Sequence, residues 1–171
     1  MSDQLFNFVG GERGAWRVIE METVCGAPLA QVERVDVVEG EIDSVWLDFV
    51  WSLSGVTSYA RYVTRAEKDS LAARQAGLGR PEAICAALIP ISKSAAWWDL
   101  AQDERRKILE TDSEHIKIGM EYLPAIARRL HHCREIGGEF DFLTWFEYAP
   151  EHSEAFEELV ARLRSREEWK Y

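Results

Sequence analysis

The last third of the chain combines two strand-like segments with one amphipathic helix, and this combination limits the possible folds more than any other feature. Residues 128–133 and 140–147 are predicted strands, and the turn between them contains Gly137 and Gly138, which favours a hairpin. Apolar side chains then recur at helical spacing, at Phe156, Leu159, Val160 and Leu163. A helix with one apolar face must cover a sheet, so we expect an α+β fold.

Earlier segments add further strands. Enrichment in β-branched and aromatic residues predicts strands within residues 16–24 and 45–63. The short apolar run 84–91 predicts a strand that is buried on both faces. A last strand is expected to begin near Glu168.

Two helices are expected between these strands. Thr64 and Glu67 form a capping-box pattern, in which a hydroxyl and a carboxylate satisfy each other's backbone donors, so a helix should begin there. A second helix is predicted over about 103–122, and Pro124 discourages its continuation.

The chain contains no tract rich in Pro, Gly and Ser and no long run of one charge. We therefore expect one compact domain over residues 1–171, with an N-terminal half of about 1–92 and a C-terminal half of about 93–171. Strands and helices interleave in both halves, which suggests two α+β, ferredoxin-like units whose sheets combine into one curved sheet or barrel.

The net charge of −10 and the pI near 4.9 exclude several partner classes. Nucleic acids and anionic membranes would be repelled, so neither is an expected partner. The first residues lack the basic segment and apolar run of a secretory signal, and no stretch is long enough to span a bilayer, so we expect a cytoplasmic protein. An anionic substrate would need a local positive charge.

Cysteine and histidine spacing argues against disulfides and zinc. Cys25, Cys85 and Cys133 are far apart and odd in number, so reduced thiols are expected. His131, His132 and Cys133 are consecutive in a predicted strand, and their side chains point alternately to opposite faces. They cannot chelate one ion together.

His115 and Arg128 are the candidate functional residues. His115 lies in the predicted helix among apolar neighbours, so it is either a hydrogen-bonded histidine of the core or surface, or an axial haem ligand through a neutral ring nitrogen. Arg128 is either a solvated surface charge or a fixed cation on the opposite face of a planar cofactor. These residues alone indicate only an α+β protein with a pocket.

Several motifs occur together in a recognisable order. They are Ile-Pro-Ile-Ser-Lys-Ser-Ala-Ala-Trp-Trp at 89–98, Glu-His at 114–115, Ala-Arg-Arg-Leu-His-His at 127–132 and Asp-Phe-Leu-Thr-Trp-Phe-Glu at 141–147. In these motifs and in the offset from His115 to Arg128 the chain resembles the chlorite dismutase family. The resemblance extends over most of the chain from Ser58 onward.

The resemblance implies a tandem of two fused ferredoxin-like units, forming a dimeric α/β barrel-type domain with haem b in its C-terminal half. His115 would be the axial ligand of the haem iron and Arg128 the arginine on the distal side. Glu168 would accept a hydrogen bond from His115, although the neighbouring Glu167 remains an alternative. The other implied site residues are Leu130, Thr144 and Phe146 in the distal wall, and Ser58, Tyr59, Lys93 and Trp97 near the haem edge and propionates.

The implied activity is conversion of chlorite to chloride and dioxygen through an iron-oxo and hypochlorite intermediate, with Arg128 retaining the hypochlorite. Short members of the family that lack a signal peptide are typically dimers, so a homodimer is expected. Alternatives within the superfamily are a coproporphyrin-haem decarboxylase, in which a glutamine usually replaces the distal arginine, and a peroxidase-like enzyme. A non-catalytic haem carrier or sensor is the alternative from another class.

Overall fold

The computed structural model describes residues 4–42, 48–57, 64–74 and 77–171. The chain divides into two compact units, and each unit contains two segments of the sequence. The first unit comprises residues 1–59 and 130–143, and the second comprises 60–129 and 144–171. Two strands of the last third of the chain belong partly to each unit. The expected halves of about 1–92 and 93–171 stay a prediction.

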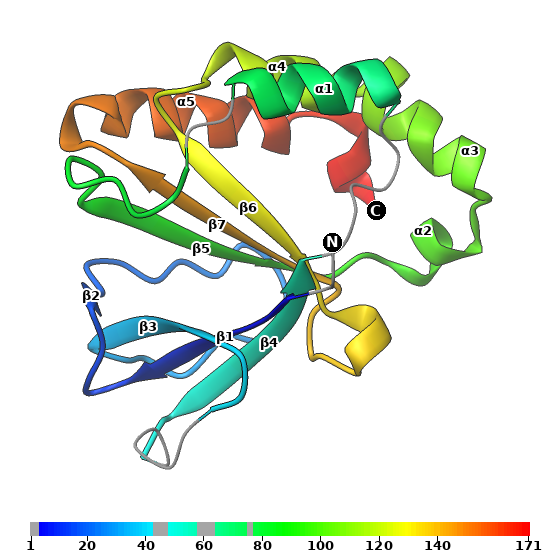
Figure 1. Ribbon diagram of the computed structural model, residues 1–171. Helices are drawn as coiled ribbons and strands as arrows, with labels where there is room; N and C mark the ends of the chain where they lie inside the picture. Colours follow the sequence, from blue (N-terminus) through cyan, green and yellow to red (C-terminus); the bar gives the residue numbers. More distant parts are fainter. Residues whose placement is uncertain (1–3, 43–47, 58–63, 75–76) are drawn as a thin grey trace. The chain divides into compact units, whose positions relative to one another are not determined.

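An antiparallel sheet in the order β2-β3-β1-β4 forms the first unit (Figure 1). Its strands are β1 (Gln4–Gly11), β2 (Trp16–Arg17), β3 (Arg34–Glu39) and β4 (Trp51–Thr57). The strand predicted over 16–24 is wrong beyond Arg17, and the one predicted within 45–63 is confirmed only as β4. Residues 58–63 lie outside the described part of the chain.

The end of β6 (Ala127–His132) belongs to the first unit and pairs with β4 through His132 and Val56. His131 is fully buried there, with its ring edge-on to the rings of Phe6 and Phe8 at 5.3 and 5.0 Å. Its Nδ1 lies 3.2 Å from the carbonyl oxygen of Leu143. His131 is therefore a core residue of this unit.

The second unit contains the longer helices and the remaining strands. Its helices are α1 (Arg65–Arg74), α2 (Ala95–Asp99), α3 (Gln102–Arg106), a π-helix (Lys107–Asp112), α4 (His115–Glu121) and α5 (Ser153–Arg164). Its strands are β5 (Cys85–Ile91) and parts of β6 and of β7 (Phe142–Tyr148), with β7 between β6 and β5. Short 3-10 helices cover Arg134–Ile136 in the first unit, and Pro150–His152 and Glu167–Lys170 in the second.

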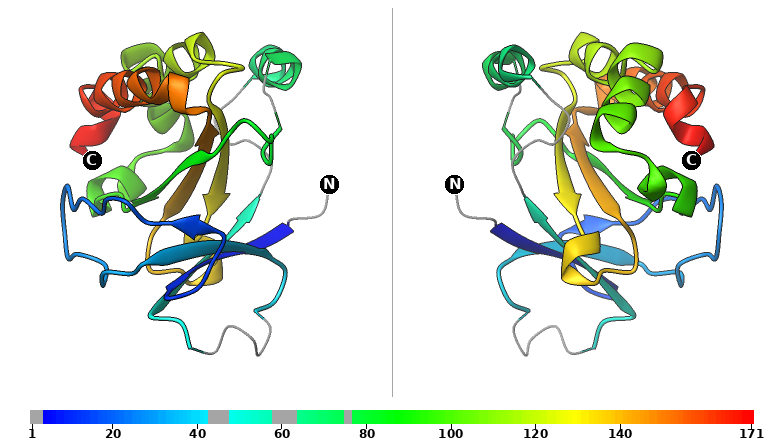
Figure 2. Two further views of the ribbon diagram at one scale, coloured as in Figure 1. Left: turned by 90° about the vertical axis from the view of Figure 1, so that its left-hand side faces the viewer. Right: turned by 90° about the vertical axis from the view of Figure 1, so that its right-hand side faces the viewer.

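The core of the second unit lies where α4 and α5 cover β7 (Figure 2). Phe156 of α5 stacks on Tyr148 at 4.7 Å and meets Phe146 edge-on at 5.4 Å. Leu159 of α5 and Ile118 of α4 also belong to this buried cluster. The predicted amphipathic helix is therefore confirmed, and antiparallel strands combined with helices confirm the mixed α and β class.

Three expectations for the second unit are wrong. The strand β5 is present, but all its residues are half-buried, because it lies at the edge of the sheet beside β7. A 3-10 helix, Glu167–Lys170, replaces the strand expected near Glu168. The single helix expected over 103–122 is divided into α3, the π-helix and α4.

Among the described residues no helix is long and apolar enough to cross a bilayer.

Candidate functional site

His115 is the first residue of α4, and the backbone just before it is unusual. Glu114 has a left-handed conformation with φ of 53°, which is uncommon for a residue other than glycine. It follows the π-helix and separates it from α4. This break, and not a continuous helix, sets the position of the imidazole of His115.

A buried carboxylate holds that imidazole. The Nδ1 atom of His115 lies 2.6 Å from Oε1 of Glu168, whose side chain is only 4% exposed, whereas the imidazole is 35% exposed. Because an ionised carboxylate can only accept hydrogen bonds, Nδ1 carries the hydrogen in this pair. The Nε2 atom is therefore the ring nitrogen with a lone pair to offer, and it makes no hydrogen bond within the described part of the chain.

Two backbone contacts fix Glu168 in place. Its N–H donates to Oγ of the fully buried Ser113 at 3.1 Å, and its carbonyl oxygen accepts from Nζ of Lys93 at 2.5 Å. The Lys93 ammonium also lies over the rings of Trp97 and Trp169, at 4.8 and 5.4 Å from their centroids. Ser113 and Lys93 thus hold the backbone of Glu168, and the carboxylate of the same residue contacts His115.

The neighbouring Glu167 is placed differently. Its carboxylate pairs with Lys170 at 2.5 Å, and its side chain is 43% exposed. Adjacent residues of a 3-10 helix point about 120° apart, so only one of the two glutamates can face His115. Glu168 is the one that contacts it.

Arg128 of β6 reaches α4 on the side of His115. Its Nη1 donates to the carbonyl oxygen of Gly119 at 3.1 Å. Gly119 follows His115 by four residues, so both lie on the same face of α4. Burial lowers the pKa of Arg128, because desolvation disfavours the charged form. Sequence reasoning placed Gly119 on or near the helix face of His115 but did not predict its contact with Arg128.

The other site residues that the family resemblance implies differ in how far they are buried. Trp97 is buried, with its ring edge-on to Tyr171 at 5.7 Å. Phe146 lies in the core cluster beneath α5, and Thr144 is half-buried on the same side of β7. In the first unit Leu130 is 46% exposed. Ser58 and Tyr59 lie outside the described residues.

The donor set around His115 fits a haem. The Glu168 carboxylate engages Nδ1 of His115, which leaves Nε2 as a donor of the kind that binds haem iron. On the same helix face the guanidinium of Arg128 lies against Gly119. We find this donor set compatible with a porphyrin that is ligated from α4.

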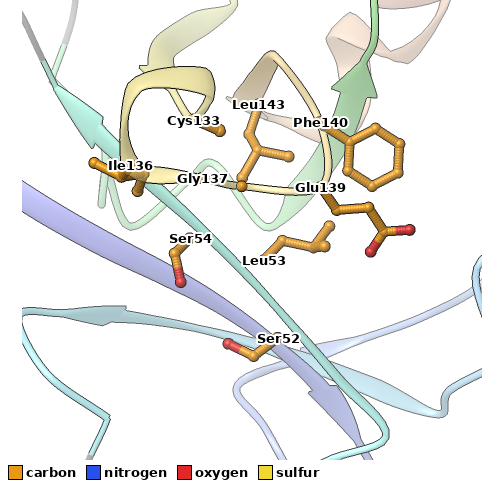
Figure 3. A pocket seen from close by; sticks show the side chains of 10 residues that line it. Ser52, Leu53, Ser54, Cys133, Ile136, Gly137, Glu139, Phe140 and Leu143 are labelled. Atoms are coloured by element: carbon orange, nitrogen blue, oxygen red, sulfur yellow. The ribbon is translucent and has the colours of Figure 1, made fainter.

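A cavity of about 240 Å³ lies in the first unit between β4 and the turn that contains Gly137 (Figure 3). Ser54, Cys133, Glu139 and Leu143 are among the residues that line it. Burial raises the pKa of the Cys133 thiol to about 12, so this cysteine is protonated and unreactive at neutral pH. The cavity therefore offers no thiolate nucleophile.

A second cavity, of about 450 Å³, lies in the second unit beside α4. Glu67, Glu110 and Ile116 help to line it, whereas His115 and Arg128 do not. Burial raises the pKa of Glu110 to about 7, although the positive charge of a protonated His115 would oppose this shift. Sequence reasoning missed Glu110, which carries no local signal because its burial arises from the fold.

Comparison with known proteins gives concordant matches. The family model described as Chlorite dismutase matches residues 35–171. The curated chlorite dismutase of Ideonella dechloratans is 29% identical over 129 residues, which is 74% of this chain but only 43% of that protein. This chain thus spans less than half the length of that relative.

Solved structures also match. The crystal structure of dimeric chlorite dismutases from Nitrobacter winogradskyi is 54% identical, with a TM-score of 0.90 over 97% of this chain and 93% of that chain. The chlorite dismutase of Candidatus Nitrospira defluvii in complex with imidazole is 28% identical, with a TM-score of 0.57 over 78% of this chain and 50% of that chain.

Proposed function

Because the chain belongs to the chlorite dismutase family, we propose that it binds haem b and converts chlorite to chloride and dioxygen. The observation that supports this most directly is the 2.6 Å contact between His115 Nδ1 and Glu168 Oε1, which leaves Nε2 for an iron ion. When bound, the haem iron supplies the redox centre at which oxygen leaves chlorite and the oxygen–oxygen bond forms. Both oxygen atoms of chlorite end in the dioxygen molecule, and chlorine leaves as chloride.

In this proposal His115 would hold the haem iron through Nε2, and Glu168 would support His115. A carboxylate on the far ring nitrogen fixes the tautomer and orientation of the imidazole, and it increases electron donation to the metal. Ser113 and Lys93 act through the backbone of Glu168, because they hold its N–H and carbonyl groups. These contacts position residue 168 so that its carboxylate faces Nδ1 of His115.

Arg128 has the role of holding the anions on the distal side. The chain carries a net charge of −10, so an anionic substrate needs a local cation. A guanidinium remains protonated at neutral pH and binds anions through charge-assisted hydrogen bonds, but it does not transfer protons. The remaining residues proposed around the haem are Leu130, Thr144 and Phe146 in the distal wall, and Ser58, Tyr59, Lys93 and Trp97 near its edge.

We extend the proposal to assembly and location. The relative at 54% identity is described as dimeric, which supports a homodimer. We propose in addition that each chain consists of two fused ferredoxin-like units that form a barrel-type domain. Light scattering of the purified protein would test the dimer, and a monomer mass at micromolar concentration would contradict it. The cytoplasmic location stays a prediction of the sequence, to be tested by cell fractionation.

An oxygen electrode tests the activity. The haem-loaded protein should release dioxygen in an amount equal to the chlorite consumed. His115→Ala should lose the Soret band of histidine-ligated haem, and Arg128→Ala should bind haem but give a lower oxygen yield and bleach faster. Arg80→Ala is a matched control, because Arg80 also donates to a backbone carbonyl, that of Ala125 at 2.9 Å.

Other outcomes would contradict the proposed activity or favour one of the alternative functions. If the haem-loaded protein left chlorite unchanged, the proposed activity would be wrong. Conversion of coproporphyrin haem to haem b in the presence of peroxide would identify a decarboxylase. Haem binding with neither reaction would identify a carrier or sensor.

A further inference from the structure

The cavity of about 450 Å³ beside α4 is separate from the proposed haem site. Ile116 and Met120 line it from one face of α4, since residues four apart share a helix face. His115 and Gly119 lie on the adjacent face, because each residue of an α-helix is turned by about 100° from the one before it. The volume of the cavity lies within the range of roughly 300–1,000 Å³ that is usual for small-molecule sites.

Two of the three glutamates that line this cavity are paired with arginines. The carboxylate of Glu67 accepts from Nη2 of Arg106 at 3.1 and 3.2 Å, and that of Glu121 accepts from Nη1 of Arg162 at 2.6 Å. The third, Glu110, is half-buried and forms no salt bridge within the part of the chain that the structure describes. Its charge is therefore the least compensated of the three.

We propose that this cavity binds a small organic cation with a short alkyl chain, of the alkylguanidinium or alkylammonium class. The cationic head pairs with the Glu110 carboxylate, and the alkyl chain covers Ile116 and Met120. Guanidinium and ammonium groups donate charge-assisted hydrogen bonds to carboxylates, and these are stronger than bonds between neutral groups. This inference goes beyond the proposed function, because it involves neither haem nor chlorite.

The surroundings of Glu110 favour a cation over an anion. Burial raises the pKa of its carboxyl to about 7, and the negative charge of Glu67 adds to this shift. The positive charges of Arg106 and of a protonated His115 oppose the shift, but neither residue forms a salt bridge with Glu110. A cation at the carboxylate would offset both the lost hydration and the repulsion by Glu67. An anion would add to that repulsion.

The two basic residues that line the cavity do not compensate Glu110. Nζ of Lys117 pairs with the Glu114 carboxylate at 2.5 Å, and the Lys117 side chain is 70% exposed. Arg74 is exposed in the last turn of α1 and forms no salt bridge with Glu110. Both positive charges therefore face solvent, where screening weakens their repulsion of a bound cation.

Titration of the purified protein with n-butylguanidinium chloride tests the proposal. The guanidinium group stays protonated and offers no lone pair, so it does not act as a ligand of haem iron. At about pH 8, above the pKa of Glu110, NMR signals of the Ile116 and Met120 methyl groups should shift in a saturable way. n-Butylurea has a similar shape without the charge. It should bind about tenfold more weakly, which is at the lower end of the effect of a hydrogen bond to a charged group.

A charge-removing variant locates the cationic head. Glu110→Gln keeps the shape of the side chain, and it should weaken butylguanidinium binding about tenfold, to the affinity of butylurea. Glu158→Gln is the matched control, because it removes an exposed charge of the same kind from α5, outside the cavity. The control should bind butylguanidinium as tightly as the wild type does.

The length of the alkyl chain tests the apolar part of the site. Each methylene that contacts Ile116 and Met120 should tighten binding by up to about fourfold, so methylguanidinium should bind more weakly than butylguanidinium. Equal affinities for these two cations would contradict the proposed contact with α4.

Other results would overturn the proposal as a whole. These are equal affinities of the wild type for butylguanidinium and butylurea, unchanged butylguanidinium binding in Glu110→Gln, or methyl shifts away from Ile116 and Met120. Tighter binding of pentanoate, an anion of similar size, would assign the cavity to anions that pair with Arg74, and the inference would then be wrong.

Discussion

Replacement of Glu168 by glutamine isolates the effect of one buried charge on the proposed haem site. The side chain has nearly the same shape, and the contacts with Ser113 and Lys93 are retained because they use the backbone of residue 168. The amide oxygen can still accept from Nδ1 of His115. Only the negative charge at 2.6 Å from the imidazole is removed.

The size of the effect follows from the geometry. Mutation of an outer partner of a metal-bound histidine typically weakens metal binding about 10- to 100-fold. This corresponds to roughly 1.4–2.7 kcal/mol of binding free energy. The carboxylate stabilises ferric more than ferrous haem, because the ferric iron carries the larger positive charge. If the whole loss falls on the ferric state, the reduction potential rises by about 60–120 mV, at 59 mV per tenfold change.

Haemin titration and spectroelectrochemistry measure both quantities. Glu167→Gln is the matched control, since that carboxylate is next in the chain but pairs with Lys170 at the surface. It should change neither the haemin affinity nor the potential. The reasoning would be refuted by equal potentials in the wild type and Glu168→Gln, or by an equal shift in both variants.

Three further predictions concern the stability of the haem-free protein in urea. Burial raises the pKa of Glu110 from 4.5 to about 7, so its stabilising contribution is complete below pH 4.5 and is lost as the pH rises through 7. The free energy of unfolding of the wild type should therefore fall over that pH range relative to that of Glu110→Gln. If the free energies of unfolding of the two proteins changed with pH in parallel, this prediction would be wrong. Glu114→Gly should be about 1 kcal/mol more stable than Glu114→Ala, because φ is 53° at this position and glycine adopts such a conformation without the steric cost of a Cβ atom. Equal urea midpoints for the two variants would show that this backbone conformation is not strained. Phe156→Ala should cost about 3–5 kcal/mol by removing a buried ring stacked on Tyr148, and a loss below 1 kcal/mol would mean that this core repacks.

Elements that depend on local patterns were predicted well. The capping box is present, with the Thr64 N–H donating to Glu67 at 2.6 Å and the Glu67 N–H donating to the Thr64 hydroxyl at 3.3 Å. The apolar spacing of α5 correctly indicated its buried face, including Leu159, which has no exposed surface. Such patterns lie within a few residues of each other, so the sequence displays them directly.

Elements that depend on tertiary contacts were not predicted. The break before His115 uses a left-handed Glu114, and a glutamate carries no signal for that conformation. The contact of Glu168 with His115 was implied by the family resemblance, but the strand expected around it was wrong. In the 3-10 helix that forms there, the backbone N–H and carbonyl of residue 168 bond to Ser113 and Lys93, which are remote in the sequence, so these groups are not available to a sheet.

These long-range contacts connect the proposed ligand site to the fold of the second unit. Ser113 precedes α4, Lys93 follows β5, and Glu168 lies near the end of the described chain, so the carboxylate reaches His115 only when three distant segments are assembled. An unfolded chain lacks this assembly and should bind haem less tightly. Haem binding must then stabilise the second unit, by an amount that grows with the logarithm of the free haem concentration divided by its Kd.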